Sequence, residues 1–281
     1  MTGRMCWEEV GLTSLNPLKF DRLKSVISGY ESVLVAFSGG IDSAFVLKVA
    51  RDTLGFEKAK AVTAKSPSLA ARELEEARAF AETFRIEHKI IETEEFENPH
   101  YTSNPSDRCY YCKEELYAKL IPMARAWNLK TVASGTQLDD LGDIRPGLRA
   151  AEEYGVKNPL VEAGFTKQDV REWARHAGIE LWSKPASPCL SSRVPHGEAI
   201  TLEKLAQIEA GENFLKDLGF KIIRLRHLGH KARVELGTEE FVALMEAGLR
   251  ERATDFIRSL GFKVVVFEPY RQGRLNEQTV H

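Results

Sequence analysis

The sequence predicts an α/β protein in which a parallel β-sheet carries helices on both faces, followed by a smaller α/β domain. Short apolar, β-branched runs alternate with amphipathic helical segments through the first half of the chain, as in repeated strand–helix–strand units. Residues 33–37 (VLVAF) form a continuous apolar run, which is typical of a strand buried on both faces of a parallel sheet. Helical periodicity begins soon after this run and ends at Gly55.

The other elements of the larger domain follow from the same periodicities. Proline and asparagine mark the loop that leads to Cys109, and a threonine N-cap opens the helix that begins near Thr166. The expected strands are 33–37, 60–64, 86–91 and 131–136; the expected helices are 16–30, the segment ending at Gly55, 69–84, 113–127 and 166–177; loops are expected at 93–107, 137–147 and 182–193.

The smaller domain begins after a segment dense in proline and serine, residues 182–193, which predicts an irregular stretch or a linker. We therefore place the larger domain at 1–197 and the smaller one at 198–281. Alternating charged and apolar residues on either side of Gly229 predict a β pair. The expected elements are a helix over 201–218, strands at 221–227 and 232–236, helices within 238–260 and a strand at 263–267.

Composition narrows the possible functions. The chain of 281 residues has a formal net charge of -2, so it has no strongly basic footprint for a nucleic-acid backbone. This charge weakens RNA-binding hypotheses and leaves a local basic patch open. No stretch approaches the roughly 20 apolar residues of a membrane span, and the first ten residues lack the apolar core of a signal peptide. We expect a cytoplasmic protein. The chain has four cysteines: Cys6, Cys109, Cys112 and Cys189. Four cysteines are too few for a protein of this size to be held together mainly by disulfide bonds.

Residues 38–43 (SGGIDS), which we call the glycine loop, lie where the first strand gives way to a helix. Gly39 and Gly40 let backbone N–H groups approach a ligand closely, and the helix N-terminus attracts negative charge. The loop therefore predicts a phosphate site. It is not a kinase-type P-loop, because Asp42 stands where that motif needs lysine. Gly135, near the end of the strand at 131–136, also allows close backbone approach.

Two polar features could hold metal ions. Cys109 and Cys112 lie one turn apart, and with Cys189 they could bind zinc, with a histidine such as His196 as fourth ligand, or an iron–sulfur cluster with one open iron. A dithiol that carries a persulfide is a third reading. The loop at 137–147 is acidic, and it could serve ATP or Mg²⁺ through Asp139, Asp140 and Arg145, or be a solvated loop.

The string at 36–43 (AFSGGIDS) resembles the signature of the PP-loop ATP pyrophosphatases. The resemblance implies that the loop holds the β and γ phosphates of ATP while a substrate oxygen attacks the α phosphorus, and that Mg²⁺ balances the charge with help from Asp42. The ATP-binding residues implied in this way are Ala36, Ser38, Gly39, Gly40, Asp42, Ser43 and Gly135.

Four motifs together look like the LarE family, which comprises ATP-dependent sulfur transferases of nickel-pincer nucleotide cofactor synthesis. They are the glycine loop, residues 142–148 (GDIRPGL), residues 191–197 (SSRVPHG) and residues 270–276 (YRQGRLN). The family implies adenylation of pyridinium-3,5-biscarboxylic acid mononucleotide and conversion of its carboxylates to thiocarboxylates. It also suggests a homo-oligomer and a sulfide or cysteine-derived sulfur donor.

One position departs from part of this family. Members that sacrifice a single cysteine carry it directly after a Lys-x-Ala-Ser stretch, where this chain has Pro188. The chain resembles instead a three-cysteine branch, in which Cys109, Cys112 and Cys189 hold a 4Fe-4S cluster that carries the sulfide. The residues predicted to be catalytic are therefore these three cysteines and Asp42, with zinc or a persulfide as the alternative state of the cysteines.

A phosphorylated pyridinium substrate needs cations for its phosphate and carboxylates, and guanidinium groups suit both. The resemblance supports an anion site in which glutamates orient the arginines or accept from the ribose. The alternative is salt bridging on the surface. The predicted residues are Ser192, Arg193, Glu212, Arg224, Arg226 and Glu235.

Three rival functions remain at this point. A PP-loop tRNA thiolase with a three-cysteine 4Fe-4S cluster is the main one, although it usually has lysine where Ile41 stands and needs a basic surface. An amide-forming ligase of the NAD synthetase type would leave the three cysteines without a role. A regulator that binds zinc and a nucleotide would show no ATP–pyrophosphate exchange.

Overall fold

The structure, a computed structural model, describes residues 15–142, 146–246 and 248–271. Cys6, Arg145 and residues 272–276 of the last motif lie outside this part of the chain. The chain forms two compact units: unit 1 comprises Met1–Ser66, Ala71–Glu94 and Cys109–Ala186, and unit 2 comprises Pro67–Ala70, Glu95–Arg108 and Ser187–His281. The division into functional domains at 197/198 stays a prediction, whereas the last change between compact units falls between Ala186 and Ser187.

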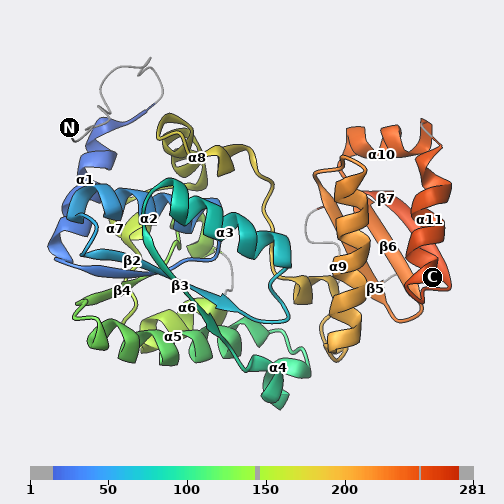
Figure 1. The fold of residues 1–281 in the computed structure, drawn as a ribbon, viewed down its shortest axis with the longest axis horizontal. Coiled ribbons are helices and arrows are strands. Elements are labelled where there is room, and N and C mark those ends of the chain that lie inside the picture. The colour runs from blue at the N-terminus through green and yellow to red at the C-terminus, as the bar shows by residue number, and fades with distance from the viewer. Residues whose placement is uncertain (1–14, 143–145, 247, 272–281) are drawn as a thin grey trace. The chain divides into compact units, whose positions relative to one another are not determined.

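Unit 1 is built on a four-stranded parallel sheet with strand order β3-β2-β1-β4. The central strand β1 (Val33–Ala36) is buried throughout, and its Val35 pairs with Ala61 of β2 on one side and Ala133 of β4 on the other. Helices cover both faces, with α1 and α2 on one and α5 and α6 on the other (Figure 1). The predicted fold class is thus confirmed.

Each face of this sheet has its own apolar core. On the α1 and α2 face, the rings of Phe20 and Trp173 stack with centroids 4.2 Å apart, and on the α5 face Tyr117 and Leu120 pack with Leu34. The elements of unit 1 are α1 (Pro17–Gly29), β1, α2 (Ile41–Leu54), β2 (Ala59–Lys65), α3 (Ala71–Thr83), β3 (Glu87–Glu92), α5 (Arg108–Ala126), β4 (Thr131–Ala133), η2 (Leu138–Gly142), α6 (Pro146–Glu153), α7 (Pro159–Ala163), α8 (Lys167–His176) and η3 (Glu180–Ser183).

Unit 2 is built on a three-stranded sheet with order β5-β6-β7, in which β5 and β6 are antiparallel, as predicted, and β7 runs parallel to β6. Leu225 and Val234 are fully buried, and the Leu225 side chain lies against Gly211 of α9. The elements of unit 2 are η1 (Glu95–Glu97), α4 (Pro99–Thr102), η4 (Leu190–Arg193), α9 (Leu202–Asp217), β5 (Ile223–Leu228), β6 (Lys231–Leu236), α10 (Thr238–Glu246), α11 (Leu249–Ser259) and β7 (Val264–Pro269).

Several predicted boundaries were wrong. The loop expected at 93–107 contains η1 and α4, because Asn98 caps a helical turn that opens with Pro99, a pairing that favours helix initiation. The long helix α5 begins at Arg108 rather than at residue 113, so it includes both cysteines of the C-x-x-C motif. Strand β4 ends at Ala133 rather than at residue 136. The helices α6 and α7 were not predicted at all.

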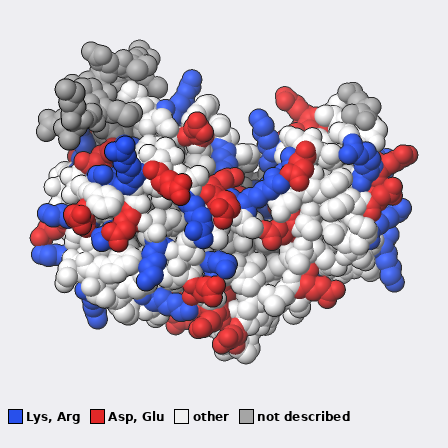
Figure 2. All heavy atoms as spheres, viewed as in Figure 1, with Lys and Arg blue, Asp and Glu red and all other residues white. Residues whose placement is uncertain are grey.

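Two surface properties bear on the function. None of the described helices is long and apolar enough to cross a membrane. On the face of the molecule drawn in Figure 2, acidic and basic side chains are interspersed without an extended patch of one sign.

Candidate functional site

Hydrogen bonds join the two ends of the glycine loop of unit 1. The backbone N–H of Ser38 donates to Ser43 Oγ (3.2 Å), and Ser43 Oγ in turn donates to the carbonyl of Gly40 (3.1 Å). Gly39 has a φ of 75°, a left-handed conformation that favours glycine. Gly40 caps helix α2 without a side-chain hydrogen bond, so the first backbone N–H groups of the helix are available to an anion.

Gly135, which follows the end of the neighbouring strand β4, lies close to this loop. A Cβ atom at this position would lie 2.5 Å from the backbone nitrogen of Ser43 and 2.7 Å from its Cα. Glycine is therefore required at position 135 because two backbones meet there. The sequence predicted close approach of this backbone to a ligand, which stays a prediction; the structure shows its close approach to the start of helix α2.

Replacing Gly135 by alanine is expected to displace the glycine loop. Overpacking of this kind costs about 1–3 kcal/mol, and because the contact is with backbone, the start of α2 must shift. We expect both a lower unfolding free energy and an ATP affinity reduced more than about tenfold. Gly29→Ala is the matched control, since a Cβ at Gly29 meets nothing within 4 Å. Equal ATP affinity of the two variants, measured by calorimetry, would contradict this explanation.

Asp42 lies in the first turn of α2. Its Oδ1 is buried and accepts no hydrogen bond among the described residues. Burial, followed by the negative charge of Asp140, raises the pKa of the Asp42 carboxyl to about 6, although Lys167 and Arg171 oppose the shift. An orphaned carboxylate oxygen close to a second aspartate is suited to a divalent cation. The residues thus fit the predicted Mg²⁺.

The neighbouring acidic loop is more ordered than its sequence suggested. Asp140 accepts a hydrogen bond from the backbone of Gln137 (3.2 Å), and Asp139 accepts one from the backbone of Lys167 at the start of α8 (2.6 Å). Asp139 therefore has a structural role in capping a helix. Of the polar residues proposed in this loop, the structure brings Asp140 into electrostatic contact with Asp42.

The predicted cysteine site is divided between the two units. Cys109 is exposed and Cys112 half-exposed in the first turns of α5 in unit 1, and Cys189 is exposed immediately before η4 in unit 2. Among the described residues, the structure contains no group of three or more metal-ligating side chains. Thiolates one turn apart suit iron or zinc by their chemistry. The metal centre itself stays a prediction.

Contacts within unit 2 hold the chain next to two of these cysteines. The buried Arg108, which precedes Cys109, donates to the carbonyl of Ser191 (3.1 Å). The buried Asn104 donates to the carbonyl of Pro195 (2.7 Å) and accepts from Arg108. The sequence analysis did not identify Arg108 or Asn104 as residues that position the cysteines. The only sequence signal there was the Asn104-Pro105 pair, which indicates a turn.

Arg193 and Glu212 form a buried, two-pronged ion pair in unit 2. Nε and Nη2 of Arg193 donate to the two carboxylate oxygens of Glu212 at 2.8 and 3.0 Å, and the two side chains are 2% and 5% exposed. Nη1 of Arg193 donates to the carbonyls of Pro188 and Cys189 and to Ser192 Oγ. The guanidinium therefore uses its donors inside the protein, where it fixes the turn that carries Cys189.

The other predicted anion-site residues lie on the strands β5 and β6. Arg226 donates through Nε to Glu235 (3.0 Å) and through Nη1 to the carbonyl of Ser192 (3.1 Å). Burial, then the charge of Arg193, lowers the pKa of Arg224. All the arginines and glutamates of this set are buried rather than on the surface, which contradicts the surface salt-bridge alternative; they are Arg193, Glu212, Arg224, Arg226 and Glu235.

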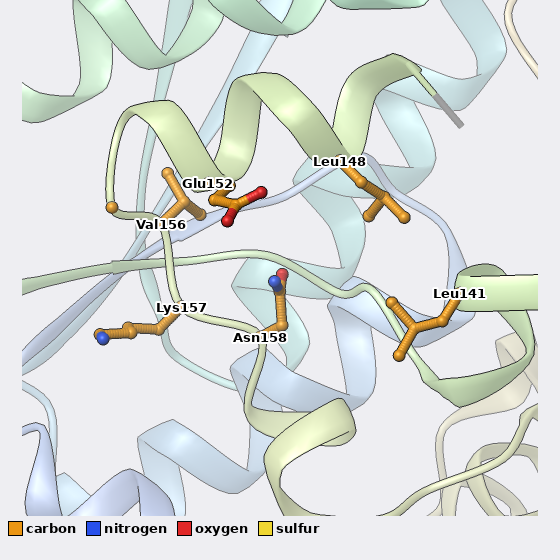
Figure 3. A pocket seen from close by; sticks show the side chains of 7 residues that line it. Leu141, Leu148, Glu152, Val156, Lys157 and Asn158 are labelled. Atoms are coloured by element: carbon orange, nitrogen blue, oxygen red, sulfur yellow. The ribbon is translucent and has the colours of Figure 1, made fainter. Parts of the chain in front are cut away.

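A separate cavity of about 350 Å³ lies beside the edge strand β4 in unit 1. Figure 3 shows Leu141 and Leu148 at one end of it and the side chain of Lys157 directed away. None of the predicted ATP-binding residues lines it, although its Asn158 accepts a hydrogen bond from Ser134 (2.7 Å), the neighbour of Gly135. The lining residues are Leu141, Leu148, Glu152, Gly155, Val156, Lys157 and Asn158.

Comparisons with known proteins agree with the sequence resemblance. The chain is 42% identical over 260 residues to an uncharacterised protein of Synechocystis sp., covering 92% of this chain and 97% of that protein. It is 35% identical over 257 residues to the pyridinium-3,5-bisthiocarboxylic acid mononucleotide synthase of Lactiplantibacillus plantarum, covering 91% and 92% of the two chains.

A second similarity covers only part of the chain. The NAD synthase family profile matches residues 20–118. The glutamine-dependent NAD(+) synthetase of Aquifex aeolicus is 34% identical over 82 residues, which is 29% of this chain and 14% of that protein. The residues that the family profile matches contain the predicted phosphate site. They include the first two segments of unit 2 and not its third segment, Ser187–His281.

Proposed function

This chain belongs to the LarE family of PP-loop ATP-dependent sulfur transferases, and we propose that it converts the carboxylates of pyridinium-3,5-biscarboxylic acid mononucleotide into thiocarboxylates. The observation that carries the proposal is the 35% identity to the Lactiplantibacillus plantarum synthase along 91% of the chain. The glycine loop at the start of α2 leaves the helix N-terminus without a side-chain cap, and Asp42 Oδ1 is buried without a hydrogen bond from any described residue; both observations support the ATP-dependent half of the reaction.

In the first step a substrate carboxylate oxygen attacks the α phosphorus of ATP, the bond to the bridging oxygen breaks, and pyrophosphate leaves. The backbone N–H groups of Gly39 and Ile41 would hold the β and γ phosphates, while that of Gly40 donates to Ser38 Oγ (3.3 Å). Asp42 and Asp140 would hold Mg²⁺, which offsets the charge of the departing pyrophosphate. The resulting acyl adenylate has AMP as leaving group, so a sulfur nucleophile can displace it from the acyl carbon.

We propose further that Cys109, Cys112 and Cys189 hold a 4Fe-4S cluster, which supplies sulfide when it is bound. Thiolates are the usual ligands of such clusters, and three of them leave one iron open. Arg108 and Arg193 support the proposal, because their hydrogen bonds to Ser191 and Cys189 fix the chain next to Cys109 and Cys189. The alternatives are a zinc ion or a persulfide at the same cysteines, and the iron and sulfide analysis described below distinguishes them from the cluster.

The function is tested by ATP–pyrophosphate exchange. Exchange of labelled pyrophosphate into ATP is expected only when pyridinium-3,5-biscarboxylic acid mononucleotide is present, and AMP is expected to accumulate once sulfide is added. Nicotinic acid adenine dinucleotide with ammonia tests the amide-forming alternative. Exchange with that compound and none with the dicarboxylated nucleotide would contradict the proposal.

The cluster is tested by the absorption and iron content of protein purified without oxygen. Wild-type protein is expected to be brown and to contain iron and acid-labile sulfide, and Cys109→Ala is expected to lose both because a thiolate ligand is removed. Cys6→Ala is the matched control and should keep its colour. Colourless wild-type protein with one zinc per chain would contradict the cluster while leaving the ATP site untouched.

A further inference from the structure

The charged face of the unit 2 sheet holds one arginine that the predicted anion site did not include. Arg233 of β6 is 6% exposed. It pairs in register with Arg226 of β5, so the two side chains emerge side by side on one face of the antiparallel pair. Like charges directly opposite each other destabilise a sheet. Their coexistence here needs a negative partner.

Among the described residues, the carboxylate of Glu235 offsets only part of the positive charge of Arg226 and Arg233. Glu235 is fully buried, and its Oε2 accepts a hydrogen bond from Nε of Arg226 (3.0 Å) and lies 2.9 Å from Nη2 of the same guanidinium. Nε of Arg233 lies 3.1 Å from the other carboxylate oxygen of Glu235, but the two atoms are not aligned for a hydrogen bond. Nη2 of Arg233 is also buried without a hydrogen-bond partner among the described residues. One carboxylate thus lies between two guanidinium groups, and the part of the chain that the structure describes leaves one of these guanidinium groups partly without hydrogen bonds.

The neighbouring charges do not remove this excess. Arg224 lies on the same face as Arg226, because side chains two residues apart on a strand point to the same side. Glu268 of β7 is in register with Glu235 and adds a second carboxylate. Three guanidinium groups therefore face two carboxylates on this sheet. Buried polar groups in native proteins are almost always hydrogen-bonded, and a buried charge without a full set of partners is costly.

We propose that Arg233, together with Arg226, binds an oxyanion of the nucleotide substrate, either its phosphate monoester or a pyridinium carboxylate. The unsatisfied N–H groups of Arg233 would donate to the oxyanion, while Glu235 orients both guanidinium groups. The identity of the ligand rests on the proposed function, whereas the oxyanion site rests on the buried, unsatisfied arginine. Arg233 is then a substrate-binding residue in addition to those that the sequence motifs indicated.

The test compares Arg233→Met, Arg233→Lys and the control Arg258→Met, which removes an exposed arginine from α11, in the full-length protein. The assay is ATP–pyrophosphate exchange. Arg233→Met is expected to raise the KM for the dicarboxylated nucleotide about tenfold to a hundredfold, because charged hydrogen bonds to the substrate are lost. The KM for ATP is expected to stay unchanged. Arg233→Lys should recover only part of this loss, because an ammonium group lacks the planar fork.

Thermal unfolding without ligand separates binding from a purely structural role. Arg233→Met is expected to unfold at the wild-type temperature or above it, since it removes an unsatisfied buried charge. A lower unfolding temperature together with a KM like that of Arg258→Met would mean that Arg233 only supports the fold, and would overturn the proposal.

Calorimetry with inorganic phosphate and with pyridine-3,5-dicarboxylate distinguishes the two sources of the oxyanion and is independent of turnover. The probe whose affinity falls in Arg233→Met but not in Arg258→Met identifies the group that is bound. If wild-type protein showed no exchange but lost one of these affinities in Arg233→Met, the proposed function would fail and the oxyanion site would stand. Equal affinities for both probes in wild type and Arg233→Met would overturn the site.

Discussion

Replacing Asp42 by asparagine is expected to abolish ATP–pyrophosphate exchange and, at the same time, to stabilise the ligand-free protein above pH 6. Activity is lost because the variant lacks the charge proposed to hold Mg²⁺ at the glycine loop, and interactions of this kind change rates by several orders of magnitude. Stability rises because asparagine keeps the shape of the side chain without burying a negative charge near Asp140.

The pH dependence of this effect follows from the raised pKa of the Asp42 carboxyl. Between its ordinary range near pH 4 and the folded-state pKa of about 6, the folded protein binds a proton that the unfolded chain has lost. The wild type therefore loses stability as the pH rises through this interval. Asp42→Asn should be more stable than wild type by at most about 3 kcal/mol at pH 7.5, and by almost nothing at pH 4.

Urea unfolding at pH 4, 5.5 and 7.5 measures this difference, and Asp21→Asn provides the control, because Asp21 is an exposed carboxylate of α1. A stability advantage that is the same at all three pH values would show that the charge of Asp42 is not its cause. Exchange activity retained in Asp42→Asn would instead remove this carboxylate from the proposed metal site.

Replacing Glu212 by glutamine is expected to destabilise unit 2 by about 3–5 kcal/mol, because it removes one partner of a buried ion pair and leaves the other charged. Glu212 accepts from two nitrogens of Arg193 and from the backbone of Leu225. Glutamine keeps the size of the side chain but turns an N–H group toward the guanidinium. Denaturant unfolding, followed by tryptophan fluorescence and circular dichroism together, measures the loss.

A double variant separates the pair's contribution to stability from its contribution to function. Arg193→Met combined with Glu212→Leu should recover much of the stability, since apolar residues can replace a buried ion pair. It should not recover sulfur transfer, because the hydrogen bonds from Arg193 to the carbonyls of Pro188 and Cys189 stay lost. Full activity in the double variant would show that Arg193 is not needed to fix the Cys189 turn.

The sequence predicted well where neighbouring residues decide the structure. The apolar run before the glycine loop, the threonine cap at Thr166 and the alternation on either side of Gly229 are local signals, and each corresponds to the observed element. The family resemblance was confirmed along nearly the whole chain. The start of α5 was missed because Arg108 is held by Asn104 and Ser191, and a window of neighbouring residues contains only the first of these.

By itself, then, the sequence determined the parallel α/β fold, the glycine loop and the family, because strand burial, helix capping and a short motif are properties of contiguous residues. Only the tertiary structure decided how the charged residues are used. Three contacts that matter for the site join segments that are separated along the chain. They are the ion pair of Arg193 with Glu212, the pairing of Arg226 with Arg233, and the approach of Gly135 to Ser43. Burial then converts these ordinary side chains into strongly interacting ones, because charges without water must find partners within the protein or in a ligand.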